Sequence, residues 1–178
     1  LEYLLDHLGD VTEIYFVGGE PLIMPEHYKV LKAVLEGKYT DIYLRYNTNL
    51  TTLGKNDQAV DYWIKLKGQG NKIEVGLSLD AIGEVAEYVR YGCKWGVVLS
   101  NRRKLIENDI HIMVRPTVSG LNVWHVQDLI DLCIAEGISG FDIANANIVT
   151  GPSHYDMRIL TDEDKEKTIQ RIQEYLKE

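Results

Sequence analysis

The sequence contains little cysteine, with only Cys93 and Cys133 among its 178 residues. Two cysteines are too few for a disulfide framework, so we expect a reducing, cytoplasmic location and two small buried side chains. The sequence also lacks an apolar run of the length that a bilayer span requires. We therefore expect neither a disulfide-stabilised secreted protein nor a membrane protein.

Positive charge is scarce as well. The chain carries 19 Lys and Arg against 27 Asp and Glu, which gives a net charge of −8. A nucleic-acid-binding surface needs a basic face, and the cluster at 102–104 lies in a helix-like stretch where a solvated face explains it. We expect no nucleic-acid partner. The sequence also lacks a serine–histidine–aspartate pattern, a phosphate-binding glycine loop and zinc-ligand spacing.

What the sequence does have is a regular alternation of strand-like and helix-like segments, with enough apolar residues (45%) for one domain over 1–178. Such alternation predicts parallel strands with right-handed crossovers. Five units fall short of the eight of a closed barrel, so the sequence predicts an α/β partial barrel. The expected strands are 11–17, 41–46, 72–79, 109–118 and 141–149; the expected helices are 1–8, 25–39, 56–67 capped by Asn56, 93–108, 123–136 and a last one capped by Thr161.

The run Val-Gly-Gly-Glu-Pro-Leu at 17–22 ends the first predicted strand. Gly18 and Gly19 allow unusual torsion angles and leave space for a close approach to the backbone. Pro21 fixes the exit of the turn and favours an extended conformation at Glu20. A carboxylate held in this way typically receives an ammonium group or a bidentate donor. The alternative is an ordinary strand-to-helix turn with an acid near a helix N-terminus.

Polar side chains also gather where the other predicted strands end. In parallel α/β folds, ligands bind at the carboxyl ends of the strands. Amides, hydroxyls and a few carboxylates are groups that recognise a ribose, an amino acid and a purine. Each residue alone could instead satisfy its own backbone. The set comprises Asn47, Thr48, Asn49, Thr51, Thr52, Ser78, Asp80, Arg115, Thr117, Ser119, Asn122, Asn145 and Asn147.

From Val11 to about Val149 the chain resembles the radical S-adenosylmethionine (radical SAM) family, whose fold is a partial (β/α)6 barrel of parallel strands. The residues Gly18, Gly19, Glu20 and Pro21 resemble its GGEP motif. This resemblance implies that the backbone there and Glu20 hold the methionine amino group of S-adenosylmethionine. The run at 46–49 resembles the family's third-strand end, which implies that Asn47 and Asn49 approach the cofactor.

The run Ser78-Leu-Asp80-Ala resembles the family's fourth-strand motif. The resemblance implies that Ser78 and Asp80 meet the ribose hydroxyls or the methionine carboxylate, and that Arg90 pairs with that carboxylate. The stretch 114–118, with Thr117, and Asn122 resemble the fifth-strand pattern. Simpler roles stay open: a helix cap for Asp80, a strand hydroxyl for Ser78 and a surface position for Arg90.

The chain departs from the family in one respect. The family binds a [4Fe–4S] cluster through three cysteines spaced CxxxCxxC, and no such triplet occurs in this chain. Leu1 would fall in the helix after the cluster loop. We therefore expect a piece of a longer protein, with the first βα unit and the cluster cysteines upstream and no catalysis by this piece alone.

The resemblance implies that the intact protein cleaves S-adenosylmethionine to a 5′-deoxyadenosyl radical, which abstracts hydrogen from a small-molecule or peptide substrate. It also implies an electron donor such as flavodoxin or ferredoxin. One alternative is a barrel isomerase, lyase or aldolase, but Lys72 stands at the wrong end of its strand for such chemistry. The other is a degenerate barrel that binds a nucleoside-type ligand or a partner without catalysis.

Overall fold

The computed structural model describes residues 1–138, 140–141 and 147–177. These residues form two compact units, residues 1–77 with 96–113 and residues 78–95 with 114–178. That residues 1–178 make one domain stays a prediction. The first unit contains α1 (Glu2–Asp6), η1 (Leu8–Asp10), β1 (Glu13–Phe16), η2 (Pro21–Ile23), α2 (Pro25–Glu36), β2 (Tyr43–Thr48), η3 (Lys55–Asp57), α3 (Gln58–Gly68), β3 (Lys72–Leu77) and most of α5 (Trp95–Glu107) and β4 (His111–Val114).

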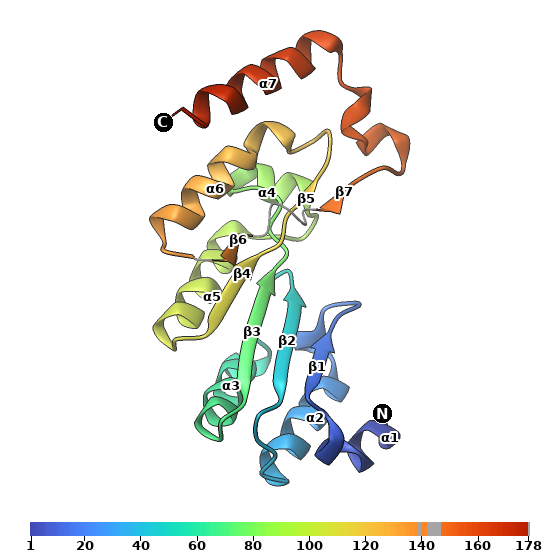
Figure 1. The fold of residues 1–178 in the computed structure, drawn as a ribbon, viewed down its shortest axis with the longest axis vertical. Coiled ribbons are helices and arrows are strands. Elements are labelled where there is room, and N and C mark those ends of the chain that lie inside the picture. Colours follow the sequence, from blue (N-terminus) through green and yellow to red (C-terminus); the bar gives the residue numbers. More distant parts are fainter. Residues whose placement is uncertain (139, 142–146, 178) are drawn as a thin grey trace. The chain divides into compact units, whose positions relative to one another are not determined.

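The core of the first unit is a parallel sheet in which β1, β2, β3 and β4 are neighbours in that order (Figure 1). β1 pairs with β2 from Glu13 opposite Tyr43, and β2 pairs with β3 from Tyr43 opposite Lys72. Because all three strands run the same way, their carboxyl ends meet at one edge. The predicted Glu20 turn and the Asn47–Asn49 segment both lie at that edge.

Two helices cover the same face of this sheet, as the contacts of Tyr46 demonstrate. The Tyr46 ring is fully buried and meets His27 of α2 on one side and Trp63 of α3 on the other. The alternating burial of β2 follows from this arrangement, because successive side chains of a strand point to opposite faces. Pro25 begins α2 as predicted, since a proline at the first helical position loses no hydrogen bond.

The opposite face of the sheet carries a polar cluster. Arg45 donates to Glu13 at 2.9 Å and to Glu74 at 3.2 Å, and its guanidinium lies over the rings of Tyr15 and Tyr43. Hydrogen bonds with these carboxylates raise the pKa of Arg45 above its ordinary value. The cluster satisfies the charges on this half-exposed face, and no described helix lies against it in Figure 1.

The second unit is mostly helical and contains one small parallel pair of strands, β5 with β7, in which Thr117 lies opposite Asn147. Thr161 caps α7 as predicted, because its side chain accepts from the Asp164 N–H. Asn145 lies outside the described residues. The elements are α4 (Gly83–Val89), β5 (Thr117–Val118), η4 (Val123–His125), α6 (Val126–Ala135), β6 (Gly140–Phe141), β7 (Asn147–Ile148), η5 (Ser153–Tyr155), η6 (Met157–Ile159) and α7 (Asp162–Tyr175).

Two local predictions are wrong. Asn56 does not cap α3: it has a positive φ of 54°, and the helix begins after Asp57, which makes no side-chain cap. The predicted strand over 109–118 divides into β4 and β5, with Arg115 and Pro116 between them. Pro116 has no N–H to give to a ladder, which explains the interruption.

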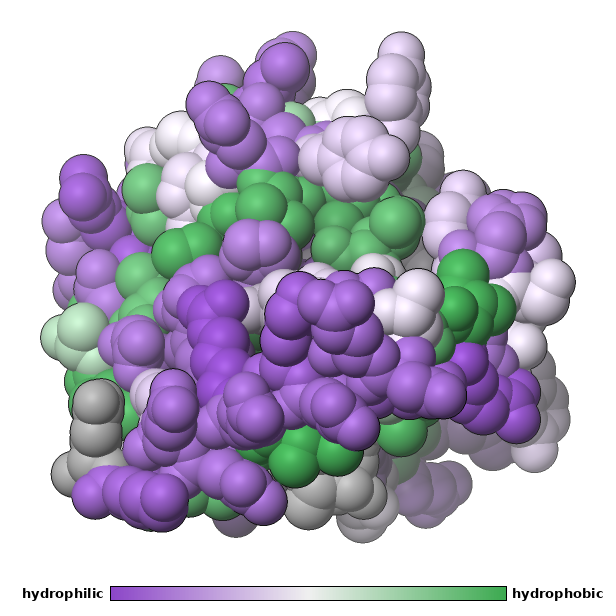
Figure 2. Space-filling view, turned by 90° about the horizontal axis from the view of Figure 1, so that it is seen from above, coloured by the Kyte–Doolittle hydropathy of each residue, from purple (hydrophilic) through white to green (hydrophobic). Residues whose placement is uncertain are grey.

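Hydrophilic side chains dominate the surface seen in Figure 2, with apolar residues in patches between them. Apolar side chains are exposed even on the charged helix α7, where Ile169 is 54% exposed, and at Leu176 just after it, which is 77% exposed. Over the described part of the chain, no helix combines the length and the apolar character that crossing a membrane would need.

Candidate functional site

The turn after β1 leaves its two glycines open to the surroundings. Gly18 has a φ of 102°, which a residue with a Cβ rarely adopts, and both Gly18 and Gly19 are exposed. A Cβ added at either position would meet no atom within 4 Å. Crowding by neighbouring atoms of the protein therefore does not explain why glycine stands at these two positions. They leave the backbone accessible at the carboxyl edge of the sheet.

Glu20 joins the ends of β1 and β2. Its Oε1 accepts from the Thr48 hydroxyl at 2.7 Å and from the Leu22 N–H at 3.3 Å. Its Oε2 accepts from the Asn49 N–H at 2.9 Å. A carboxylate offers about four acceptor positions, so these three bonds leave one position on Oε2. Pro21, which is buried, fixes the backbone immediately after the carboxylate.

The two predicted asparagines of this edge differ in their environment. Asn49 is half-buried, and its side-chain oxygen accepts from the N–H and the hydroxyl of Thr51 at 2.9 and 2.6 Å. This is the local turn that such residues commonly form. Asn47 is half-buried on the same sheet face as Arg45, two residues earlier in β2. In the first unit the structure therefore brings together the glycine turn, Glu20 and Asn49.

In the second unit, Asp80 is the centre of a buried hydrogen-bond network. Its side chain, 7% exposed, accepts from Arg90 Nε at 2.6 Å and from the Thr117 N–H at 2.7 Å. Asn122, which is fully buried, donates to the carbonyl of Asp80 at 2.7 Å and to that of Thr117 at 2.8 Å. The structure therefore brings Asp80, Arg90 and Thr117 together. The helix-cap alternative for Asp80 does not apply, because α4 begins after Ile82.

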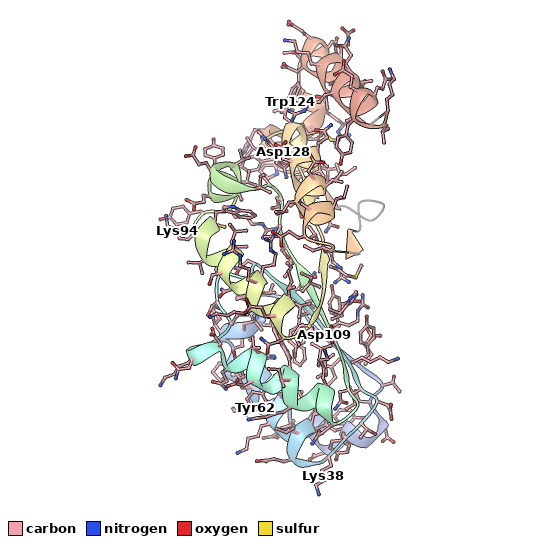
Figure 3. The ribbon with its side chains drawn as sticks, turned by 90° about the vertical axis from the view of Figure 1, so that its left-hand side faces the viewer. Lys38, Tyr62, Lys94, Asp109, Trp124 and Asp128 are labelled. Atoms are coloured by element: carbon pink, nitrogen blue, oxygen red, sulfur yellow. The ribbon has the colours of Figure 1, made fainter. Side chains whose placement is uncertain are left out.

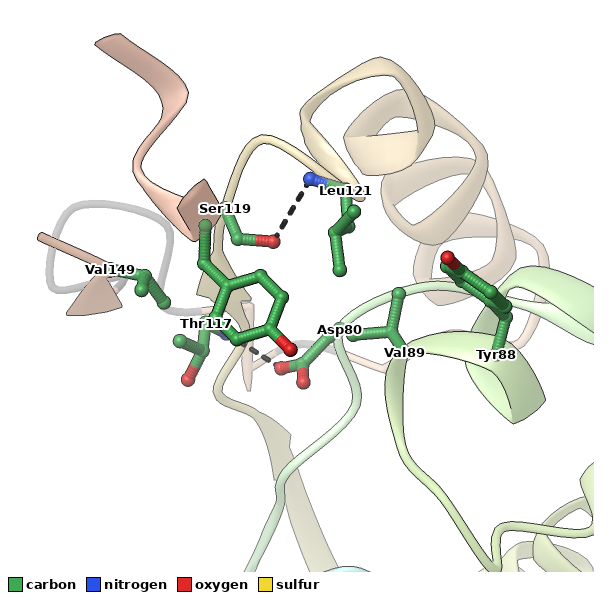
Figure 4. Close-up of a pocket in the computed structure, with 8 residues that line it drawn as sticks. Asp80, Tyr88, Val89, Thr117, Ser119, Leu121 and Val149 are labelled. Atoms are coloured by element: carbon green, nitrogen blue, oxygen red, sulfur yellow. Dashed lines mark hydrogen bonds between the residues drawn. The ribbon is translucent and has the colours of Figure 1, made fainter. Parts of the chain in front are cut away.

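A cavity of about 480 Å³ opens above Asp80 (Figure 4). Its floor is polar and its walls are apolar and aromatic, a combination typical of small-molecule sites. Ser78, half-buried directly after β3, is not among the described residues that line this cavity. The lining comprises Asp80, Tyr88, Val89, Thr117, Ser119, Leu121, Val149 and Tyr155.

The sequence patterns gave no site role to Tyr28 or Tyr88. Thr48 and Tyr28 join the Glu20 turn, and Tyr88 and Tyr155 line the cavity. The side-chain period of β2 could have indicated that Thr48 is buried beside Tyr46. No local signal distinguishes Tyr28 from the other apolar-face residues of its helix.

The two cysteines do not form a cluster site. Cys93 and Cys133 are both buried and free, and burial raises the pKa of the Cys93 thiol. No group of three or more His, Cys, Asp and Glu side chains in the described ranges is arranged to hold a metal ion. The described residues therefore do not fit a [4Fe–4S] cluster.

The fold of this chain is similar to that of solved structures. Native anSMEcpe with bound AdoMet matches with a TM-score of 0.66 and 16% identity over 97% of this chain and 47% of that chain. AnSMEcpe with bound AdoMet and the Kp18Cys peptide gives 0.65 and 18% over 96% and 48%. Comparison with the sequences of curated proteins gives no match.

These structures show the fold, and this chain spans about half of their length. The predicted α/β partial-barrel class with parallel strands is thereby confirmed. A family model, described as the radical SAM superfamily, matches residues 1–133. The GGEP-like and SLDA-like residues on which the resemblance was based both lie within that match, and the chain belongs to the radical SAM superfamily.

Proposed function

We propose that this chain binds S-adenosylmethionine at the carboxyl ends of its strands, as the core of a radical SAM enzyme. The observation that carries the proposal is the acceptor position left on Glu20 Oε2 beside two open glycines. An ammonium group is a donor that suits such a position, because a charge-assisted hydrogen bond is about twice as strong as a neutral one. The methionine amino group would supply it.

Taken by itself, the second unit offers groups that suit a ribose, a carboxylate and a base, all of which S-adenosylmethionine contains. Asp80 keeps one acceptor position on each oxygen after its bonds to Arg90 and Thr117, which suits a pair of ribose hydroxyls. Arg90 uses only its Nε on Asp80, so its terminal nitrogens can bind a carboxylate. Aromatic and apolar walls suit the flat face of a base.

The radical chemistry is proposed only for a protein in which further chain supplies the cluster. The family's [4Fe–4S] cluster would have to be held by residues outside 1–178, because these contain no cysteine triplet for it. An electron donor such as flavodoxin or ferredoxin belongs to the same proposal. So does a small-molecule or peptide substrate, and the peptide bound to anSMEcpe makes that class worth testing first.

Calorimetric titration with S-adenosylmethionine and with its analogue lacking the α-amino group tests the ammonium assignment. The parent should prefer the natural cofactor by about tenfold, which corresponds to one hydrogen bond to a charged group. Glu20→Gln should remove most of this preference. Glu26→Gln, an exposed glutamate on α2, is the matched control and should keep it. Equal affinity of the parent for both ligands would contradict the assignment.

A further inference from the structure

Tyr28, in the first turns of α2, reaches back to the turn that carries Glu20. Its hydroxyl donates to the carbonyl of Leu22 at 2.7 Å. The N–H of the same Leu22 donates to Glu20 Oε1 at 3.3 Å. Leu22 is fully buried, so it is held from both sides, by the Tyr28 hydroxyl and by the Glu20 carboxylate. A shift of Leu22 would therefore shift the carboxylate.

Gly54 lies directly against the Tyr28 hydroxyl. A Cβ at position 54 would lie 2.0 Å from the Tyr28 oxygen and 3.4 Å from the Leu22 carbonyl oxygen. Gly54 also has a φ of 80°, which favours glycine. The loop after β2 thus packs directly over the hydrogen bond between Tyr28 and Leu22, and only glycine permits this approach.

The charge of Glu20 acts on Tyr28 as well. Burial first, and then the negative charge of Glu20, raise the pKa of the Tyr28 phenol above its ordinary value. A phenol is protonated at neutral pH in any case, and the raised pKa extends the range in which this hydroxyl can donate to higher pH. Both the geometry and the charge make Tyr28 a constant donor to the turn.

We propose that Tyr28 is a positioning residue: its hydroxyl, packed under Gly54, sets where the Glu20 carboxylate stands and thereby the selectivity of the site for a ligand with an ammonium group. The inference rests on the function proposed above. Tyr28 itself touches neither the open glycines nor the remaining acceptor position. Its effect passes through Leu22.

Tyr28→Phe tests this directly, because it removes the hydroxyl and keeps the ring. The preference for S-adenosylmethionine over its desamino analogue should fall from about tenfold to about threefold or less. Tyr62→Phe is the matched control. Tyr62 of α3, labelled in Figure 3, lies with its ring centroid 6.1 Å from that of Tyr28 and has no hydrogen bond to the turn. It should keep the parent's preference.

Gly54→Ala tests the same inference by displacing the hydroxyl instead of deleting it. We expect the preference to fall as in Tyr28→Phe. Gly68→Ala is its control, because Gly68 is exposed at the end of α3, and an added Cβ there meets no atom within 4 Å. An undiminished preference in both Tyr28→Phe and Gly54→Ala would overturn the inference.

Amide hydrogen exchange separates this inference from the proposed function. In Tyr28→Phe the Leu22 N–H should exchange about fivefold faster or more, with no such change in Tyr62→Phe. If the parent itself shows no preference for the amino group, the proposed function fails, and the claim about selectivity fails with it. The exchange rate of the Leu22 N–H then still tests whether Tyr28 fixes the position of Glu20. An unchanged rate in Tyr28→Phe would reject that claim as well.

Discussion

At the scale of single residues, Glu20 and Asp80 each have two tasks. Glu20 accepts from the Leu22 N–H, the Thr48 hydroxyl and the Asn49 N–H, and Asp80 accepts from the Arg90 guanidinium and the Thr117 N–H. A buried carboxylate needs such partners, because an unpaired one is costly. Each carboxylate nevertheless keeps unused acceptor positions. The hydrogen bonds that fix each carboxylate therefore also set the direction of its unused acceptor positions.

His27 gives a residue-scale prediction about pH. Burial lowers the pKa of His27 from 6.5 to about 4, so the ring is neutral in the folded protein. The unfolded chain takes up a proton as the pH falls through 6.5, and the folded chain does so only near pH 4. Stability is therefore lost as the pH falls across this window, by up to about 3 kcal/mol.

Urea unfolding at pH 7 and pH 4.5 measures this loss. The replacement His27→Phe keeps an aromatic ring among Phe16, Tyr28 and Tyr46 but cannot titrate, so it should lose about 2 kcal/mol less than the parent. His7→Gln replaces an exposed histidine and should behave as the parent does. Identical losses in the parent and in His27→Phe would show that His27 does not titrate in this way.

The Glu20 turn and its partner Thr48 indicate how much of the site the sequence could predict. The conformation of the turn from Gly18 to Pro21 is set by those residues themselves, so the sequence pattern could predict it. Thr48 is 28 positions from Glu20 and meets it only through the parallel register of β1 and β2. Such a long-range pairing has no local signature, so the sequence indicated Thr48 as a strand-end residue but not its bond to Glu20.

At the scale of elements, the entry to β3 depends on one side chain. Asn71, just before Lys72, accepts from the Ile42 N–H at 3.0 Å and donates to the carbonyls of Tyr39 and Leu66. It thus ties the start of β2 to the end of α3. It is 4% exposed, so water cannot easily replace these bonds.

Asn71→Ala should therefore lower the free energy of unfolding by about 2 kcal/mol or more, because it leaves a buried N–H without its acceptor. Lys72→Ala, at the exposed next position, should stay within about 0.5 kcal/mol of the parent. Chemical denaturation of both variants provides the comparison. A loss in Asn71→Ala no larger than in Lys72→Ala would refute this role.

The elements were more predictable than their limits. The alternation of strand-like and helix-like segments indicated β1, β2 and β3, because these segments are short and rich in apolar residues. Burial alternates along β2, whereas every residue of β3 after Lys72 is buried. The division between β4 and β5 at Pro116 was missed, because the apolar pattern continues through a residue that cannot join a ladder. Asn56 has the composition of a cap but a left-handed backbone.

At the scale of the molecule, the predicted ligand groups are divided between two compact units. The glycine turn, Glu20 and Asn49 belong to the first, and Asp80, Arg90 and Thr117 to the second. Each set is therefore tested by itself. A substitution at Glu20 and a substitution at Asp80 should each lower the affinity for S-adenosylmethionine.

Iron content is a second molecular-scale test. Reconstitution of residues 1–178 with iron and sulfide should give far fewer than the four irons per chain of a [4Fe–4S] cluster, because only two cysteines are present and both are buried. Iron and sulfide analysis after desalting measures this. A stoichiometric cluster on this chain would refute our conclusion that its residues do not fit one.

The most direct test of the central claim is calorimetric titration of S-adenosylmethionine into the parent, Glu20→Gln and Asp80→Asn, with the unfolding midpoint of each recorded alongside. We predict saturable binding to the parent and an affinity at least about fivefold lower in each variant. Exposed-site controls such as Glu26→Gln should match the parent. No binding to the parent, or folded variants that bind as tightly as the parent, would contradict the account.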